Sequence, residues 1–244
     1  MTTSLYKPVA VIPHYNHAGT LPEVVRRLLG FDLSVLIVDD GSDEQNIALI
    51  RPLEKWPNVE VYYSVQNGGK GAAMKTGLQR AFTQGFSHAL QVDADGQHNL
   101  DDVEKMLIKS CENPTALICG EPVYGADAPK SRLYGRKLTN FWIHVNTLSM
   151  NIQDGMCGFR IYPLAQTLSV IRQEYIGNRM DFDTEILVRM YWRRIPIQWI
   201  KTAVKYEAEG ISHFHGWLDN WLISKMHARL FFTMLWRKLT GKAV

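Results

Sequence analysis

Short apolar runs alternate with helix-length amphipathic segments through the first half of the chain. This alternation is typical of βαβ units, in which helices connect and cover the parallel strands of one sheet. We expect strands at residues 8–13, 33–38, 59–65, 88–92 and 116–119. Helices are expected between them, and residues suited to capping stand at their starts: Thr20, Ser42 or Asp43, and Asn99. The sequence therefore predicts an α/β fold with a mainly parallel sheet.

The second half of the chain follows a less regular pattern. Residues 121–129 contain two prolines and are expected to form a mobile loop that could gate a site. Residues 130–150 and 181–193 show helical patterns, and residues 195–204 suggest one more strand. Because the sequence contains no internal repeat and no low-complexity linker, we predict a single domain over residues 1–215.

The overall composition excludes one class of partner. The 244 residues include 27 Lys and Arg against 24 Asp and Glu, which gives a formal net charge of +3. This excess is too small for a dedicated nucleic-acid-binding protein. Three cysteines without a CxxC spacing indicate reduced thiols, and neither a signal peptide nor a membrane span is expected. We therefore predict a cytoplasmic protein; its oligomeric state is left open.

Residues 216–244 are expected to form an amphipathic C-terminal helix. The segment contains three of the seven tryptophans and five basic residues, Lys225, Arg229, Arg237, Lys238 and Lys242, against one acidic residue. This combination is typical of a helix that lies in an anionic membrane interface. The alternative is a helix that packs on the core, and both can hold for different parts of one helix. We predict peripheral association with the inner face of a membrane.

Polar residues follow the second and third expected strands. Asp39 and Asp40 end the second strand, at the edge where open α/β sheets bind ligands. A glycine-rich loop follows the third strand; there Gly69 lets the backbone approach a diphosphate, and Lys70 can offset its charge. The alternative for Asp40 is a turn and helix cap, and the loop lacks the Walker A and dinucleotide-binding spacings.

Two further carboxylates, Asp93 and Asp95, follow the fourth expected strand. Alternation along the chain directs both to the same side. Two close carboxylates need a cation or a proton, and hard oxygen ligands suit Mg²⁺ or Mn²⁺. The alternative is a solvated acidic turn before the helix that starts at Asn99. An EF-hand is excluded, because its glycine and its last glutamate would be out of register.

Taken together, these motifs resemble family 2 glycosyltransferases with the GT-A fold, and in particular the dolichyl- or polyprenyl-phosphate sugar synthases. The likeness covers roughly residues 6–214 and rests on the order and spacing of residues 12–16 (IPHYN), 38–42 (VDDGS), 67–71 (NGGKG), 93–97 (DADGQ), 154–160 (DGMCGFR) and 182–186 (FDTEI).

The resemblance implies that a nucleotide sugar is the donor and that the anomeric carbon is inverted. The residues that it assigns to the donor are Pro13, Tyr15, Asn16, Asp39, Asp40, Gly69, Lys70 and Asp93. It assigns the divalent cation to Asp93, Asp95 and Gln97, and His213 could complete that shell. The cation would stabilise the charge on the departing nucleotide.

The resemblance also implies a polyprenyl-phosphate acceptor held by basic residues. Arg132 and Arg136 stand four residues apart on one helical face, which suits a phosphate; the alternative is an ordinary solvated basic face. A phosphate needs no general base, whereas a hydroxyl acceptor would need one. The best candidates for that base are Asp183 and Glu185, with Asp154 second. The alternative for Glu185 is a helix-surface acid or a partner for Arg189 at i+4.

The segment 206–215 departs from the synthases. An arginine often precedes the glycine in that branch and a basic residue follows the serine, whereas this chain has Tyr206 and His213 in this segment. A hydroxyl or carboxylate on another lipid or lipid-like product is therefore an alternative acceptor.

Two other functions compete with this interpretation. A sugar-phosphate nucleotidylyltransferase shares the α/β layout, but residues 12–17 lack its glycine-rich basic stretch. A nucleotide-sugar-binding protein with a decayed site is opposed by the intact Asp39, Asp93 and Asp95.

Overall fold

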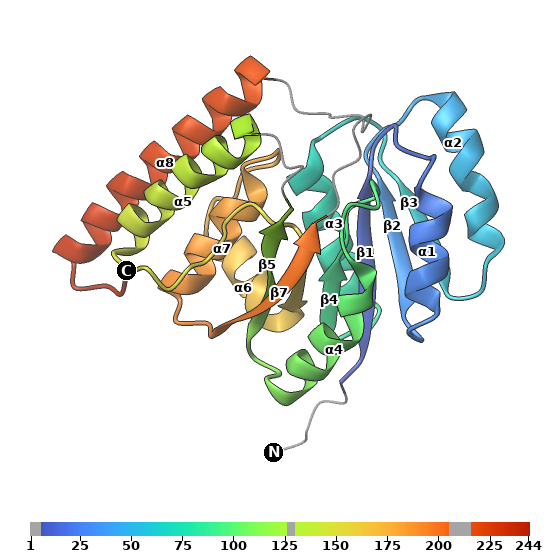
Figure 1. The fold of residues 1–244 in the computed structure, drawn as a ribbon, viewed down its shortest axis with the longest axis horizontal. Coiled ribbons are helices and arrows are strands. Elements are labelled where there is room, and N and C mark those ends of the chain that lie inside the picture. Colours follow the sequence, from blue (N-terminus) through green and yellow to red (C-terminus); the bar gives the residue numbers. More distant parts are fainter. Residues whose placement is uncertain (1–5, 126–129, 205–215) are drawn as a thin grey trace.

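One twisted sheet organises the molecule. In a computed structural model, which describes residues 6–125, 130–204 and 216–244, the sheet has seven strands in the order β3-β2-β1-β4-β6-β5-β7 (Figure 1). The strands are β1 (Pro8–His14), β2 (Ser34–Asp39), β3 (Val59–Tyr63), β4 (His88–Gln91), β5 (Leu117–Tyr124), β6 (Arg160–Pro163) and β7 (Ile197–Val204). Strand β6 pairs antiparallel with both β4 and β5, and the other pairs are parallel. The predicted mainly parallel sheet is confirmed.

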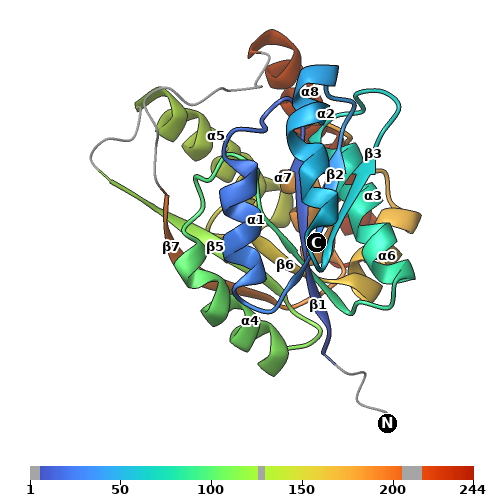
Figure 2. The same cartoon turned by 90° about the vertical axis from the view of Figure 1, so that its right-hand side faces the viewer.

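Helices cover both faces of this sheet (Figures 1 and 2). One face packs on α1 (Leu21–Leu29), α2 (Glu44–Ile50) and α4 (Val103–Glu112), and the other on α3 (Lys70–Thr83), α6 (Leu164–Gln173) and α7 (Phe182–Trp192). The alternation of strand residues explains the two layers: Val9 and Val11 of β1 join one core cluster, whereas Ala10 and Ile12 join the other. Short 3₁₀ helices, Arg51–Lys55 and Leu100–Asp102, follow α2 and precede α4.

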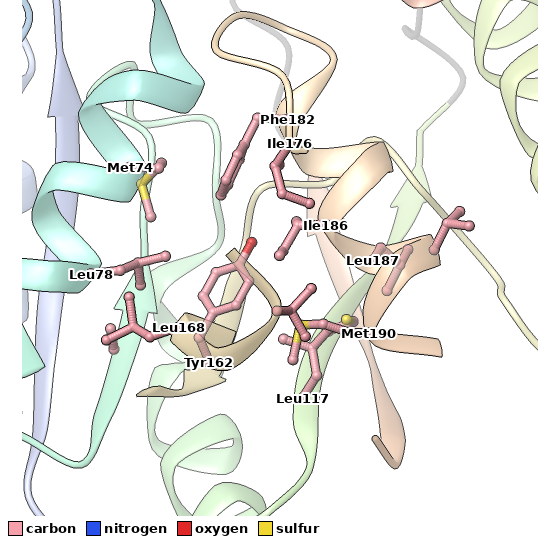
Figure 3. Close-up of a cluster of buried hydrophobic side chains, with 14 of the residues drawn as sticks. Met74, Leu78, Leu117, Tyr162, Leu168, Ile176, Phe182, Ile186, Leu187 and Met190 are labelled. Atoms are coloured by element: carbon pink, nitrogen blue, oxygen red, sulfur yellow. The ribbon is translucent and has the colours of Figure 1, made fainter. Parts of the chain in front are cut away.

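The core on the α7 side is assembled from elements far apart in the sequence. Met74 and Leu78 of α3 meet Leu168 of α6, Ile186 of α7 and Tyr162 of β6 (Figure 3). This packing joins the first half of the chain to the second, so that they share one core. It agrees with the prediction of a single domain, although no observation tests the predicted boundary at residue 215.

Two long helices form an outer layer beside α7. Helix α5 (Lys130–Thr147) and helix α8 (Gly216–Leu239) lie side by side (Figure 1). Helix α8 buries Met226, Leu230 and Met234 in the core, while Trp217 and Trp221 are 95% and 67% exposed. The helix therefore packs on the protein along one face and leaves aromatic side chains uncovered elsewhere. Among the described residues, no helix combines the length and the hydropathy needed to span a bilayer.

Three local expectations are corrected. Residues 121–124 continue β5 and pair with β7, so that only part of the expected loop remains, and residues 126–129 lie outside the described residues. Proline is tolerated there because β5 pairs with β6 only at Ile118 and Cys119, which leaves that side of Pro122 unpaired. Strand β6 and helix α6 were not predicted. Thr20 stands at the N-cap of α1, but its hydroxyl donates to the carbonyl of Ala94 instead of capping the helix.

The other helix starts agree better with expectation. Asp43 caps α2 by accepting a hydrogen bond from the backbone N–H of Asn46 at 2.8 Å. Asn99 caps the 3₁₀ turn that leads into α4, where it accepts from the N–H of Asp101.

Candidate active site

The polar motifs meet at one edge of the sheet. Strands β1, β2 and β4 are parallel neighbours, so their carboxyl ends bring His14, Asp39 and the segment that begins at Val92 together. This edge is the usual ligand site of open α/β sheets.

Asp39 is held by a small buried cluster. Its Oδ1 accepts a hydrogen bond from His14 Nδ1 at 2.7 Å and another from the Ser42 hydroxyl, and its Oδ2 accepts from the Ser42 N–H at 3.0 Å. Burial raises the pKa of Asp39, but these hydrogen bonds outweigh burial and hold it below its usual range. Sequence reasoning assigned no role to His14, although alternation places it on the buried side with Ala10 and Ile12.

Asp40 fixes the glycine-rich loop. Its two carboxylate oxygens accept the backbone N–H groups of Gly68 at 3.0 Å and Gly69 at 2.6 Å. Burial raises the pKa of Asp40, and these two bonds offset only part of that effect. Gly69 has φ of +96°, and a Cβ there would lie 2.6 Å from the carbonyl oxygen of Asn178, so no other residue fits. Asp40 thus shapes the loop that was predicted to receive a diphosphate.

Lys70, the first residue of α3, joins two carboxylates. Its Nζ lies 2.8 Å from Asp93 Oδ1 and 3.0 Å from Asp183 Oδ2. Burial disfavours the charged ammonium, but Asp183 and Asp93 more than offset burial and raise the pKa of Lys70. Likewise, burial opposes ionisation of Asp93, yet Lys70 and His98 lower its pKa. Lys70 and Asp93 therefore both remain charged at neutral pH.

A chain of hydrogen bonds that runs from Tyr162 through Gln91 holds Asp183 in place. The hydroxyl of Tyr162 donates to Gln91 Oε1 at 3.0 Å, and Gln91 Nε2 donates to Asp183 Oδ1 at 3.0 Å. Gly158 covers this group so closely that a Cβ would lie 2.7 Å from Gln91 Nε2 and 2.9 Å from Lys70 Nζ. Sequence reasoning missed these positioning contacts, because Tyr162 lies on the strand that was not predicted.

The predicted cation ligands lie on one turn after β4. Asp93, Asp95 and Gln97 line the same cavity, and Asp95 Oδ1 accepts the N–H of Gln97 at 3.0 Å. Two carboxylates and an amide oxygen are the donor types that Mg²⁺ and Mn²⁺ take, so the residues fit such an ion in kind. In the described part of the chain, no group of three His, Cys, Asp or Glu side chains is arranged to hold a metal. Gln97 would add an amide oxygen to the two carboxylates, and His213 lies outside the described residues.

Asp154 and Arg136 form an ion pair at the far side of the site. Arg136 Nη1 lies 2.5 Å from Asp154 Oδ1, which also accepts the N–H groups of Met156 and Cys157. Burial would lower the pKa of Arg136, but Asp154 raises it. The Asp154 carboxylate thus closes a turn and orients Arg136, while Arg136 lines the cavity. Arg132 belongs to α5, but its side chain lies outside the described residues.

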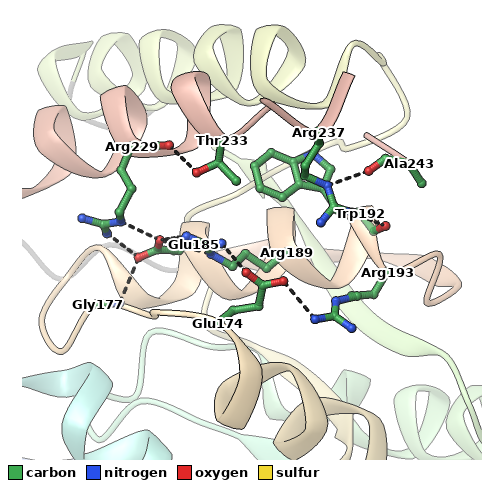
Figure 4. A network of polar contacts seen from close by, with 10 residues as sticks. All are labelled: Glu174, Gly177, Glu185, Arg189, Trp192, Arg193, Arg229, Thr233, Arg237 and Ala243. Atoms are coloured by element: carbon green, nitrogen blue, oxygen red, sulfur yellow. Dashed lines mark hydrogen bonds and ion pairs between the residues drawn. The ribbon is translucent and has the colours of Figure 1, made fainter. Parts of the chain in front are cut away.

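Glu185 is a structural residue. Its carboxylate lies 3.0 Å from Arg189 Nη2 and 2.6 Å from Arg229 Nη2, and it accepts the N–H of Gly177 at 2.9 Å (Figure 4). The i+4 pairing with Arg189 is therefore observed. Because Arg229 belongs to α8, this fully buried carboxylate fastens α8 to α7.

One cavity of about 980 Å³ connects the acidic turn to the outer helices. Asp93, Asp95, Gln97 and His98 contribute to one part of its wall. Side chains of α5 and α8 form another part, and most of these are apolar: Leu138, Trp142, Ile223, Ala228, Phe231 and Phe232. The cavity thus offers oxygen ligands and an apolar surface to the same bound molecule. Asp183 is not among the described residues that line it.

The sequence is similar to known transferases. A family model described as Glycosyl transferase family 2 matches residues 9–178. A dolichyl-phosphate beta-glucosyltransferase of Dictyostelium discoideum is 30% identical over 77% of this chain, and the chain spans 63% of that relative's length. A protein of the same name from Mus musculus is 29% identical over 95% of this chain and 75% of the relative.

Solved structures share the fold. A glucosyl-3-phosphoglycerate synthase from Mycobacterium tuberculosis, in complex with Mn²⁺ and UDP-glucose, superposes with a TM-score of 0.65. It covers 95% of this chain and 79% of its own, at 13% identity. At such low identity the likeness bears on the fold alone, and it confirms the predicted GT-A architecture.

Proposed function

The chain belongs to glycosyl transferase family 2, and from this membership we propose that it moves a sugar from a nucleotide-sugar donor to an anionic lipid acceptor. A lipid phosphate is the leading form of that acceptor. The observation that carries the proposal is a cavity whose wall combines Asp93, Asp95 and Gln97 with apolar side chains of α5 and α8. That apolar surface suits the hydrocarbon chain of a lipid, because contact with it removes the chain from water.

The donor would lie along the carboxyl ends of β1, β2 and β4. Pro13, Tyr15, Asn16 and Asp39 would contact the base and ribose, and the loop clamped by Asp40 would approach the diphosphate with Gly69 and Lys70. The backbone N–H groups at the start of α3 favour an anion there. Backbone contacts and loop shape set the choice of base and sugar, so the experiment below screens several donors.

Asp93, Asp95 and Gln97 would hold Mg²⁺ or Mn²⁺. The bound cation would offset the negative charge that develops on the departing nucleoside diphosphate. Lys70 already offsets the negative charges of Asp93 and Asp183. It thereby keeps Asp93 ionised, which a cation ligand requires. His213 remains a candidate ligand outside the described residues.

The chemistry favours an acceptor that is already ionised. An oxygen of the acceptor would attack the anomeric carbon as the bond to the diphosphate breaks, and the leaving group would take the bonding electrons, so the configuration inverts. A phosphate needs no proton removed, whereas a hydroxyl does. All three predicted bases are occupied: Asp154 by Arg136 and two backbone N–H groups, Asp183 by Lys70 and Gln91, and Glu185 by Arg189 and Arg229.

Arg136 would orient the acceptor phosphate. One N–H of its guanidinium donates to Asp154, and the other N–H groups could donate to a ligand in the cavity. Arg132, four residues earlier on α5, would assist it. The names of the relatives include dolichyl phosphate, so a polyprenyl phosphate is the first acceptor to test.

The exposed aromatic residues of α8 support contact with a membrane surface. Trp217, Trp221 and Trp236 are all exposed, and Lys225, Arg237 and Lys238 lie on the same helix. Tryptophan beside basic residues suits the headgroup region of an anionic bilayer. The lipid acceptor would enter the cavity from this surface, with the protein on the cytoplasmic side.

Transfer of labelled sugar tests the proposal. Purified protein is mixed with UDP-, GDP- or dTDP-sugars, Mg²⁺ or Mn²⁺, and vesicles that contain a polyprenyl phosphate. We expect one donor to label the lipid, and Asp95→Asn to reduce the rate by at least about 100-fold, because removing a charge from a cation ligand weakens transition-state stabilisation. Arg136→Ala should raise the KM for the acceptor with less effect on donor hydrolysis.

Asp101→Asn is the matched control, because Asp101 is an exposed carboxylate six residues after Asp95 and forms an ion pair with Arg27 away from the cavity lining. It should leave the rate unchanged. Labelling of a lipid hydroxyl or carboxylate, but not of the phosphate, would replace the leading acceptor with the alternative. Equal rates in the absence of any divalent cation would contradict the assignment of Asp93, Asp95 and Gln97.

A further inference from the structure

The cavity follows one face of α8. The residues of α8 that line it begin at Asn220 and end at Phe232, and those between them, such as Ile223 and His227, recur three or four positions apart. Residues at this spacing lie on the same face of a helix. Asn220 and Phe232 are twelve residues apart, which corresponds to about 18 Å along the helix axis. The cavity is therefore long enough to hold part of an extended chain.

Helix α5 shows which end of this face lies near the charged part of the site. Helices α5 and α8 run side by side in the same direction (Figure 1). Near their ends both contact Trp192, the last residue of α7: its Nε1 donates to the carbonyl of Asn146 at 3.1 Å, and Arg237 Nη2 donates to its carbonyl at 3.1 Å. Arg136 and Asn220 stand near the opposite ends of these helices, and both line the cavity. The lining of α8 thus starts near Arg136 and leads away from it.

The lining is mostly apolar away from Arg136. Ile223 and Phe232 are nine residues apart on α8, which corresponds to about 14 Å along the axis. A hydrocarbon chain along this stretch would leave water, which favours binding. Four more apolar residues complete the wall, namely Ala228 and Phe231 of α8 and Leu138 and Trp142 of α5.

The length of this stretch can be expressed in isoprene units. Each unit adds four bonds to the main chain of a polyprenyl lipid. An extended polypeptide gains about 3.6 Å for every three main-chain bonds, so one isoprene unit spans about 4.8 Å. About three units therefore match the 14 Å between Ile223 and Phe232.

The cavity ends before the helix does. Phe232 is 67% exposed, so the lining reaches the surface of the protein at this residue. The next exposed apolar residues of α8, Leu235, Trp236 and Leu239, are not among the described residues that line the cavity. A longer chain would pass Phe232 and leave the cavity.

We propose that the protein binds only about the first three isoprene units next to the acceptor phosphate, and that the rest of the chain lies outside the cavity. The inference rests on the proposed function and narrows its acceptor. The acceptor class is a lipid phosphate whose hydrocarbon chain starts with at least three isoprene units, whatever its total length. Units inside the cavity add to the affinity because they are removed from water, and later units add little.

Binding of polyprenyl phosphates that have one to five isoprene units tests this inference. Equilibrium dialysis with radiolabelled lipids, each below the concentration at which it forms micelles, measures the dissociation constants without any sugar donor. We expect the dissociation constant to fall about tenfold for each unit up to the third, because each unit buries further apolar surface. The fourth and fifth units should change it less than about twofold.

Two variants locate the units along the cavity. Phe232→Ala should remove most of the gain from the third unit and leave the binding of shorter lipids unchanged. Ile223→Ala, near the phosphate end, should weaken lipids of every length by a similar factor, because every chain passes this residue. Leu235→Ala is the control, since Leu235 is a partly exposed residue outside the lining, and it should change none of the constants. Melting temperatures establish that each variant is folded.

The outcomes separate this inference from the proposed function. An affinity that rises equally with every unit to the fifth, or that stops rising after the first, would overturn the inference. So would a Phe232→Ala variant that weakens the shortest lipids as much as the longer ones. Sugar transfer to a lipid phosphate alongside any of these results would leave the transferase activity in place. The expected dependence on length without any sugar transfer would support the chain-binding site and contradict the proposed function.

Discussion

The two halves of the molecule build their polar groups in different ways. In the donor half, β1–β4 with α1–α4, short loops at neighbouring strand ends bring the polar side chains into contact: His14, Ser42 and Asp39 form one cluster. In the acceptor half, β5–β7 with α5–α8, the cavity wall depends on contacts between two helices that lie far apart in the sequence. Asn146 of α5 and His227 of α8, which are 81 residues apart, are one such contact. Local motifs define the first half, and long-range packing defines the second.

The halves also differ in where their buried charge lies. Lys70 and Asp93 are half-buried, and Asp93 lines the cavity, so its charge remains within reach of a ligand. Glu185 with Arg189 and Arg229 is buried between helices and serves packing (Figure 4). The pair Lys70–Asp93 is thus placed beside a ligand site, whereas the group around Glu185 holds α8 on α7.

The largest effect is expected from Lys70→Met, which breaks the charged group of the donor half. The buried carboxylate of Asp183 and the half-buried carboxylate of Asp93 would lose their shared counter-ion. Removing one partner from a buried ion pair costs about 3–5 kcal/mol, so the free energy of unfolding should fall by that amount. Denaturation in urea measures it.

Arg80→Met is the control for this change on the same helix. Arg80 pairs with Glu60, but their side chains are 39% and 40% exposed, and such surface pairs contribute less than about 1 kcal/mol. If both variants lost the same free energy of unfolding, the ion pairs of Lys70 would be no stronger than a surface ion pair, and this contrast between the two halves would be wrong.

A smaller effect is expected when the exposed aromatic residues at the start of α8, in the acceptor half, are removed. Trp217→Ser combined with Trp221→Ser should weaken binding to anionic vesicles by at least about tenfold, because exposed indole rings lose their burial in the bilayer interface. Flotation of the protein with vesicles measures this change. Leu49→Ser with Phe82→Ser, which removes two exposed apolar side chains from the donor half, should leave vesicle binding unchanged. If this control weakened vesicle binding equally, the two halves would not differ in this respect.

The smallest effect is expected from Ser42→Ala. Loss of the hydroxyl removes one hydrogen bond to Asp39 and should reduce the free energy of unfolding by about 1 kcal/mol at pH 7. The folded-state pKa of Asp39 is lowered, so its bonds stabilise the protein above the unfolded pKa near 3.9 and lose that effect as pH falls. The difference between wild type and variant should therefore stay constant from pH 7 to about 5 and shrink as pH falls from about 4 towards 2. Denaturation at a series of pH values over both ranges measures it, and Ser34→Ala, at the start of β2, should show no such trend.

Much of the donor half could be predicted from the sequence. An acidic residue directly after an apolar run marks the end of a strand in the sequence. Asp39 follows one such run, and Asp93 follows another. In a parallel sheet these ends must share an edge, so their convergence follows from the strand assignment alone. The hydrogen-bond partners of Asp39 were harder to predict, because His14 and Ser42 come close to its carboxylate only when the loops fold.

The acceptor half was harder to predict for physical reasons. Strand β6 has only four residues, Arg160–Pro163, and its apolar character continues into α6, so no periodicity separates them. The prolines at 122 and 129 suggested a loop, whereas pairing with β7 carries β5 through Tyr124. The cavity itself depends on helix packing, which a residue pattern does not encode. His213 and the segment 206–215 lie outside the described residues.

The reversed direction of β6 has a practical consequence for redesign. Arg160, its first residue, pairs with Gln91, the last residue of β4, so the chain reaches the site before this strand rather than after it. Cys157 and Gly158, which line the cavity, come from that incoming stretch. A combinatorial library meant to retarget this protein to new substrates would therefore randomise Met156, which also lines the cavity, and would keep Gly158, because a Cβ there would lie 2.7 Å from Gln91 Nε2 of β4.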